Sequence, residues 1–248
     1  MLNAKPDNAI RALSADEAKK LGAGADHYMA YVGPPAQYDF MDGTQFRLLA
    51  ALGLRDHHKL LDFGCGSLRA GKLLIPYLQP GNYHGLEPNR WLIEDAIERE
   101  LGRDLIRLKR PVFNHNEDFV ADAFGVTFDF ILAQSIFSHA GPEIIAIVLK
   151  NFARCLADWG LVLATFVHPG PDSGEEQACS GWIYPGCYCY RPDTILGMIR
   201  SAGLFGALLP WFHPRQFWYA MALNEGGLPS LAKYGHLSGA VLRDPEFA

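Results

Sequence analysis

The residues best suited to chemistry follow a short apolar run in the first half of the chain. Residues 58–63 predict a buried strand that carries Asp62 near its end, and Gly64 and Gly66 come directly after it. Glycine allows the backbone to approach a ligand closely, and a helix that begins here would present free N–H groups. The stretch therefore predicts a ligand-binding loop at the carboxyl end of a strand.

A second carboxylate occupies the matching place in the next strand. Residues 82–87 predict that strand, and Glu87 ends it, 21 residues after Gly66. In sheets of this kind ligands bind beyond the carboxyl ends of the strands, and an acidic residue there accepts hydrogen bonds from ribose hydroxyls. The alternative is that Asp62 and Glu87 have only local partners. Their positions at the ends of neighbouring strands favour a nucleoside ligand.

The glycine spacing separates two classes of nucleoside cofactor. A dinucleotide site favours the pattern G-x-G-x-x-G, whose third glycine would stand at position 69. That position holds Arg69, and the next glycine is Gly71. Asp62, before the first glycine, would lie poorly beside a pyrophosphate but suits a ligand that carries an ammonium group. A nicotinamide-dependent dehydrogenase is therefore disfavoured.

Taken in order, the motifs of the chain resemble those of the class I S-adenosylmethionine-dependent methyltransferases. The resemblance extends over residues 60–223 and rests on three segments: Asp62-x-Gly64-x-Gly66, Gly85-Leu86-Glu87-Pro88-Asn89, and Phe128-Asp129-Phe130-Ile131 running into Ser135-Ile136-Phe137-Ser138-His139. It implies an α/β fold, with a doubly wound seven-stranded Rossmann-like methyltransferase sheet and an N-terminal helical lid. It also implies S-adenosyl-L-methionine as cofactor and S-adenosyl-L-homocysteine as product.

The same resemblance assigns cofactor contacts position by position. It assigns Asp62, Gly64, Cys65 and Gly66 to the methionine moiety, Arg69 to its carboxylate, Glu87 to the ribose, Asp118 and Phe119 to the adenine, and Gln134 and Ser135 to the surroundings of the sulfonium. Asn116 and Asp122 compete with Asp118 for the adenine role. We interpret Cys65 as a small residue between the glycines, because no paired base marks it as a nucleophile.

Two histidines are candidates for the catalytic step. His139 follows the fourth predicted strand, where an acceptor would meet the methyl group, and His168 follows the fifth. Methyl transfer from a sulfonium is a direct displacement, so the enzyme mainly aligns the reacting atoms, and a base helps where the acceptor must lose a proton. The alternative for each histidine is a structural role in which it holds a turn by hydrogen bonds.

Aromatic residues gather outside the predicted sheet. Tyr28 is the third catalytic candidate, because an aromatic ring near a sulfonium gains a cation–π contribution; the alternative is that Tyr28, Tyr31 and Tyr38 pack the N-terminal arm. A second group, in an insertion at 169–191, either walls an acceptor pocket or packs the insertion: Trp182, Tyr184, Tyr188 and Tyr190. Arg215, in a turn between the last two strands, could meet an anionic acceptor.

The order of elements predicts one sheet-based domain. Strands are expected at 58–63, 82–87, 111–114, 128–134, 161–167, 204–211 and 217–223. Helices are expected at 37–52, from the glycine loop through about 75, at 88–101, at 142–156 and at 192–202. Pro76 should kink or end the second of these helices. We divide the chain into an arm and helix (1–59), the cofactor-binding domain (60–224, with the insertion) and a tail (225–248).

The composition of the chain excludes several classes of protein. Of 248 residues, 49 % are hydrophobic, which excludes dominant disorder, and the net charge of −5 argues against a nucleic-acid partner. No apolar run reaches the ~18 residues of a membrane span, so we expect a cytoplasmic protein with no membrane partner. Its five cysteines are expected to be reduced. The Cys187-x-Cys189 spacing matches no common zinc ligand pair, and no metal is expected.

Three functions fit these observations. The leading hypothesis is methyl transfer to a small-molecule acceptor, with a homodimer left open. The first alternative is other chemistry of the same cofactor, namely cyclisation to azetidine-2-carboxylate or aminocarboxypropyl transfer, both of which release methylthioadenosine. The second is a non-catalytic cofactor-binding subunit.

Overall fold

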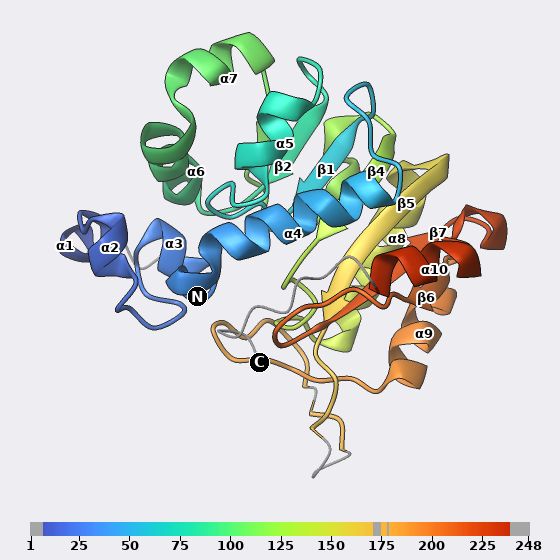
Figure 1. Cartoon of the computed structure of the whole chain (residues 1–248). Coiled ribbons are helices and arrows are strands. Elements are labelled where there is room, and N and C mark those ends of the chain that lie inside the picture. The colour runs from blue at the N-terminus through green and yellow to red at the C-terminus, as the bar shows by residue number, and fades with distance from the viewer. Residues whose placement is uncertain (1–6, 171–174, 178, 239–248) are drawn as a thin grey trace. The chain divides into compact units, whose positions relative to one another are not determined.

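A seven-stranded mixed sheet organises the chain. The computed structural model describes residues 7–170, 175–177 and 179–238, and Figure 1 shows their course. The strand order is β3-β2-β1-β4-β5-β7-β6. The strands are β1 (Leu60–Phe63), β2 (Tyr83–Leu86), β3 (Val112–Asn114), β4 (Phe128–Ala133), β5 (Leu156–Phe166), β6 (Phe205–Leu208) and β7 (Phe217–Ala222). The predicted α/β sheet with flanking helices is confirmed.

Strand direction reverses at β7, the last strand of the sheet along the chain. β1 pairs with β4, β4 with β5 and β2 with β3 in parallel, whereas β7 runs antiparallel to both β5 and β6. Parallel strands covered on both faces carry continuous apolar runs, and residues 160–166 of β5 are all buried. The two successive final strands expected from the sequence are thus present.

The chain divides into two compact units. The first comprises Met1–His58 and Gly64–Glu117, and the second Lys59–Phe63 and Asp118–Ala248. The first unit contains β2, β3 and a helical N-terminal region. Its helices are α1 (Asn8–Arg11), α2 (Ala15–Ala18), α3 (Tyr28–Tyr31), η1 (Pro35–Gln37), α4 (Tyr38–Ala51), α5 (Gly71–Tyr77), α6 (Arg90–Ala96), η2 (Ile97–Leu101) and α7 (Arg103–Lys109).

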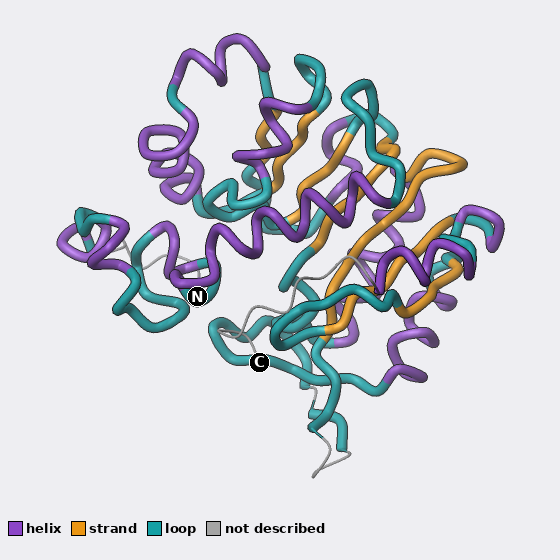
Figure 2. Tube along the Cα trace, viewed as in Figure 1, coloured by secondary structure: helices purple, strands orange, loops and turns teal. Residues whose placement is uncertain are grey.

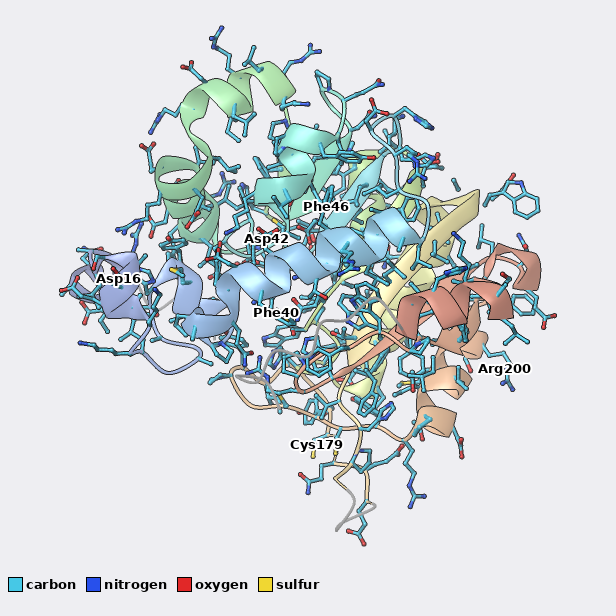
Figure 3. The ribbon with its side chains drawn as sticks, viewed as in Figure 1. Asp16, Phe40, Asp42, Phe46, Cys179 and Arg200 are labelled. Carbon is cyan, nitrogen blue, oxygen red and sulfur yellow. The ribbon has the colours of Figure 1, made fainter. Side chains whose placement is uncertain are left out.

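Helix α4 forms an uninterrupted rod in the first unit (Figure 2). It buries one face, made by Tyr38, Met41, Asp42, Gln45, Leu48 and Leu49, whose spacing is that of an amphipathic helix. Asp42 is the only residue of this face with an ionisable carboxylate, and it is buried. Figure 3 labels it on α4. Its Oδ2 lies 3.5 Å from Lys72 Nζ on α5, and burial raises its pKa to about 7 in spite of that ammonium group.

The second unit contains the remaining strands and the helices that follow them. These helices are η3 (Ala121–Phe124), α8 (Pro142–Cys155), α9 (Pro192–Ser201), η4 (Glu225–Gly227) and α10 (Leu231–Ser238). Pro142 and Pro192 occupy first helical positions, where proline's missing N–H costs nothing. Aromatic rings fill the core, with Phe63 against Phe152 (5.0 Å between centroids) and Phe137 stacked on Phe166 (4.9 Å).

Several elements differ from the sequence prediction, among them α5, β5, the unpredicted helix α7 and α10. Helix α5 begins only at Gly71, because Gly66 and Leu68 have left-handed backbone angles that no right-handed helix admits, and it continues one residue past Pro76. Strand β5 begins at Leu156, directly after α8, where the register against β4 shifts and Asp158 and Trp159 are exposed, so the start of the strand shows no continuous buried run. Helix α10 lies within the predicted tail. In the described part of the chain, no helix has the length and apolar character needed to cross a membrane.

The buried carboxylate predicts a pH-dependent stability. Since the pKa of Asp42 is raised above its unfolded value, the folded state binds its proton more tightly, and the free energy of unfolding falls as pH rises from about 4 to 7. We expect Asp42→Asn to raise stability by about 2–4 kcal/mol at pH 8, from ~1.4 kcal/mol per pKa unit, and to lose that advantage near pH 4. Thermal unfolding at several pH values measures this.

Asp104→Asn is the matched control, because that carboxylate is 92 % exposed in its side chain. At pH 8 its effect on the free energy of unfolding should be well below that of Asp42→Asn. An Asp42→Asn protein that unfolds at the wild-type temperature throughout the pH range would contradict the assignment.

Candidate functional site

The glycine loop of the first unit is held by the end of β2. The N–H groups of Gly64 and Cys65 both donate to the carbonyl of Leu86, at 2.8 and 3.0 Å. Gly64 and Gly66 have φ of +74° and +53°, which side chains rarely adopt. A Cβ at Gly66 would lie 2.6 Å from Val32 Cγ1. Both glycines of the predicted motif are therefore required by the backbone itself.

Glu87 is fixed by three hydrogen bonds at the mouth of this loop. Gly66 N donates to Oε2 at 3.1 Å, while Asn89 N and Nδ2 donate to Oε1 at 2.8 Å each. The residue is only 6 % exposed, and burial raises the pKa of its carboxyl although these donors oppose the shift. These are the local partners that the sequence left open as the alternative for Glu87, and its role at a ribose stays a prediction. The sequence did not reveal Asn89 as the residue that orients Glu87.

Arg69 and the tyrosines tie the N-terminal helices to the loop. Arg69 Nη1 donates to Val32 O at 2.9 Å, and Tyr38 OH donates to Ser67 O at 3.0 Å. Tyr28 OH donates to Glu100 at 2.6 Å, and its ring meets Tyr38 edge-on at 5.9 Å. These are the contacts of the packing alternative for Tyr28. Its role at a sulfonium stays a prediction, as does that of Arg69 at a carboxylate.

The second unit brings polar side chains together at the carboxyl ends of β4 and β5. Asp62 is buried in β1, in register with Leu132 of β4, and Gln134 and Ser135 follow β4. Ser135 N donates to Thr165 Oγ1 at 2.8 Å, and Gln216 Nε2 donates to Ser135 Oγ at 2.8 Å. The predicted pair Gln134 and Ser135 is therefore part of a network that includes residues from three strand ends.

The ring of His213 also belongs to this hydrogen-bond network. Its Nδ1 accepts hydrogen bonds from the backbone N–H groups of Arg215 and Gln216, so the neutral ring carries its proton on Nε2. That nitrogen lies 3.1 Å from Gln134 Nε2, the amide nitrogen of the side chain. The same amide also bonds to Ser135 Oγ. The sequence predicted only a turn at residues 213–216, so His213 and Gln216 were not among the predicted site residues.

His139 is buried, at 9 % exposure, and its Nδ1 lies 2.6 Å from the carbonyl oxygen of Gly186. A carbonyl only accepts, so Nδ1 carries the proton and Nε2 carries the lone pair of the neutral ring. Burial lowers the pKa of His139, although the carbonyls of Gly186 and Ile183 oppose the shift. His139 is therefore neutral at pH 7 and can accept a proton only at Nε2.

The insertion surrounds His139 with aromatic rings and the main chain. The rings of Tyr184 and Trp182 lie 4.9 and 5.7 Å from the His139 ring. Tyr188 and Tyr190 are buried instead, and Tyr190 OH donates to Ala140 O at 2.7 Å. The four aromatic residues grouped by the sequence thus separate into a pair beside the histidine and a pair that anchors the insertion. In the described part of the insertion all of them lie in loops (Figure 2).

The remaining predicted residues have other partners, except that Phe119 contacts one of the rings beside His139. His168 Nε2 lies 2.8 Å from Tyr219 OH, and its ring stacks on Phe217 at 3.8 Å. Phe119 meets the Trp182 ring at 5.5 Å, whereas Asp118 is exposed. Asp122, its competitor for the adenine role, instead accepts from Arg154 at 3.0 Å. Among the residues that the structure describes, no cluster of three or more His, Cys, Asp or Glu could hold a metal ion.

Comparisons with known proteins agree with this architecture. The profile of a family described as a methyltransferase domain matches residues 61–162. No curated protein matches the chain. Solved structures match it at low identity, which establishes a shared fold. Magnesium protoporphyrin IX methyltransferase from Synechocystis PCC 6803, solved with bound S-adenosylhomocysteine, has 12 % identity and a TM-score of 0.55, over 76 % of this chain and 84 % of that one.

Two further structures match with similar scores. The glycopeptide N-methyltransferase MtfA, complexed with S-adenosylhomocysteine, has 14 % identity and a TM-score of 0.56, over 74 % of this chain and 90 % of that one. An S-adenosylmethionine-dependent methyltransferase from Clostridium acetobutylicum ATCC 824 has 11 % identity and a TM-score of 0.54, over 75 % of this chain and 92 % of that one.

The left-handed glycine yields a prediction about stability. Gly66→Ala places a Cβ at φ +53° and against Val32, so we expect it to destabilise the protein by about 1–3 kcal/mol in denaturant unfolding. Gly43→Ala is the matched control. Gly43 lies inside α4 with open space around a Cβ, and alanine there should stabilise the protein by about 0.5–1 kcal/mol. Equal effects of the two substitutions would contradict the geometry.

Proposed function

Because the chain carries a methyltransferase domain of the S-adenosylmethionine-dependent class, we propose that it transfers the methyl group of this cofactor to a small-molecule acceptor. The observation that carries the proposal is the family match over residues 61–162, which spans Asp62, Gly64, Gly66 and Glu87. The acceptor is proposed as a small molecule because the net charge of −5 disfavours nucleic acid, and because the solved neighbours include a porphyrin and a glycopeptide methyltransferase.

The first unit contains side chains whose chemistry fits the ribose of the cofactor. The carboxylate of Glu87 is held by N–H donors on both oxygens and accepts hydrogen bonds only, as ribose hydroxyls require. Gly64 and Gly66 leave the loop without side chains, so the backbone can approach a ligand. We assign Arg69 to the cofactor carboxylate, Cys65 to filling the loop, and Asp118 and Phe119 to the adenine.

The second unit contains the residues that we assign to the reacting end. Asp62 would meet the ammonium group of the cofactor, and Gln134 and Ser135 would line the sulfonium. The sulfonium makes the methyl carbon electrophilic when the cofactor is bound. His139 then takes the proton that the acceptor loses, at Nε2, and its Nδ1–H···O=C bond to Gly186 keeps that lone pair available.

Methyl transfer and the two alternative functions differ in their products and in whether they require an acceptor. Cyclisation or aminocarboxypropyl transfer releases methylthioadenosine, whereas methyl transfer releases S-adenosylhomocysteine and requires an acceptor. A non-catalytic subunit binds the cofactor and turns over nothing. Incubation of the pure protein with the cofactor, with and without a pool of candidate acceptors, distinguishes the three by mass spectrometry. Methylthioadenosine as the main product would overturn the proposal.

Glu87 provides a test of the cofactor assignment. We expect Glu87→Ala to raise the Kd for S-adenosylhomocysteine at least tenfold in calorimetry, because a charged acceptor of hydrogen bonds contributes about 1.5–3 kcal/mol. Glu98→Ala is the control, since Glu98 is half-exposed and bonds to Arg103 on the surface. If Glu87→Ala binds as tightly as the wild type while remaining folded, the ribose assignment is wrong.

The pH dependence tests His139. A base works in its neutral form, and the pKa of His139 is lowered, so kcat/KM should stay constant above pH 6.5 and fall only at more acidic pH. His139→Asn should lower kcat by about 10²–10⁴. His57→Asn, an exposed histidine, serves as control. His168→Asn separates the two candidates: a large loss there with full turnover in His139→Asn would transfer the role to His168.

A further inference from the structure

Gln216 lies at the carboxyl end of the central strands of the sheet. It directly precedes β7, which runs antiparallel to β5, and the next residue, Phe217, is in register with Phe166 at the end of β5. In sheets of this kind ligands bind beyond the carboxyl ends of the strands. The register of β7 therefore brings Gln216 to the edge of the sheet where Ser135 follows β4.

Two hydrogen bonds fix the position of Gln216. Its backbone N–H donates to His213 Nδ1 at 3.0 Å, and its side-chain Nε2 donates to Ser135 Oγ at 2.8 Å. Ser135 is held in turn by β5, because its own N–H donates to Thr165 Oγ1 at 2.8 Å. The main chain and the side-chain amide of Gln216 are thus both anchored, and the amide oxygen has a defined position.

The amide oxygen of Gln216 is buried without a partner. The residue is 8 % exposed, and Oε1 forms no hydrogen bond with any residue that the structure describes. Buried polar groups in native proteins are nearly always hydrogen-bonded, to protein, water or ligand. An amide oxygen only accepts hydrogen bonds, so its partner must be a donor or a positively charged group.

The serine that holds this amide has a backbone conformation found at functional sites. Ser135 has a φ of +60°, which residues other than glycine rarely adopt. Such residues gather at active sites and ligand clamps, where the surrounding contacts maintain them. The hydrogen bonds of Ser135 to Thr165 and Gln216 are contacts of this kind. Gln216 therefore belongs to the same hydrogen-bonded group as the residue that we assign to the sulfonium.

We propose that Gln216 is a further cofactor-binding residue, whose Oε1 faces the methyl-bearing sulfonium of S-adenosylmethionine. This inference rests on the proposed function and adds a residue to the same site. The positive charge on sulfur polarises the C–H bonds of the methyl group, and such weak donors suit an amide oxygen. The product, S-adenosylhomocysteine, has neither the charge nor the methyl group. Gln216 thus favours a cationic group at this position and distinguishes the cofactor from its product.

Sinefungin is the probe that tests this assignment without an acceptor. This analogue carries a protonated amino group on carbon where the cofactor carries its methyl group on sulfur, whereas S-adenosylhomocysteine carries no group there. An ammonium N–H is a strong donor to an amide oxygen. We expect calorimetry on the full chain to give a Kd for sinefungin at least about tenfold below that for S-adenosylhomocysteine, because hydrogen bonds to charged groups are the strong ones.

Variants of Gln216 separate ligand recognition from a structural role. Gln216→Met keeps the length of the side chain and removes the amide. It should bring the two Kd values to within about threefold of each other and change the Kd for S-adenosylhomocysteine less than about threefold. Gln216→Glu keeps an acceptor oxygen and adds a negative charge, so it should retain or increase the preference for sinefungin. Gln177→Met is the matched control, because Gln177 is an exposed glutamine of the second unit, and it should leave the preference unchanged.

The failures of the two proposals can be told apart. If S-adenosylhomocysteine does not bind to the wild type, the proposed function fails. If it binds, but sinefungin binds no more tightly, the role of Gln216 is wrong. A Gln216→Met protein that weakens both ligands equally, or that keeps the full preference for sinefungin, would show that the glutamine acts only on the structure. Should Gln216→Met not fold, Gln216→Glu decides alone, and a preference below that of the wild type would overturn the assignment.

Discussion

The buried carboxylate of Glu87 is the constraint on which the glycine loop depends. A carboxylate removed from water is costly unless hydrogen bonds replace its hydration, and Glu87 obtains them from Gly66 and from both nitrogens of Asn89 that can donate to it. The loop and the acid therefore stabilise each other. Without Glu87 the Gly66 N–H loses its acceptor, and without the loop the charge loses a donor. The end of β2 stabilises the loop further, since Leu86 O accepts hydrogen bonds from two of its N–H groups.

The second unit also contains the insertion, whose described residues lie outside the helices and strands. Main-chain hydrogen bonds attach the insertion to the residues after β4: Tyr188 N donates to Ser138 O at 2.7 Å, Ile183 N to His139 O at 2.9 Å, and Gly141 N to Gly181 O at 2.8 Å. Because main-chain hydrogen bonds attach the insertion, its aromatic side chains can have different roles. Tyr190 anchors the insertion, while Trp182 and Tyr184 remain beside His139.

Sequence patterns predicted the parts of this fold that depend on periodicity and on glycine. The strands, helices α4 and α8, the two successive final strands and the glycine loop after β1 follow from apolar runs, proline positions and spacing along the chain. Contacts between distant segments could not be predicted in this way. The bond between His139 and the Gly186 carbonyl joins residues 47 positions apart, and that between Gln134 and His213 joins residues 79 apart. Neither leaves a local pattern. The late start of α5 could not be predicted either, because Leu68 adopts a left-handed conformation that a leucine in the sequence does not indicate.

Histidine chemistry in this protein depends on what each Nδ1 meets in the backbone. His139 Nδ1 faces a carbonyl and must donate, so its lone pair lies on Nε2. His213 Nδ1 faces two N–H groups and must accept, so its Nε2 carries a proton and acts as a donor. The two side chains are identical in composition and nearly equally buried, at 9 % and 7 % exposure. Burial alone therefore cannot assign their roles. The backbone partner therefore leaves the lone pair of His139 on Nε2 and places the proton of His213 there instead, so the two histidines present opposite hydrogen-bonding groups at the same ring position.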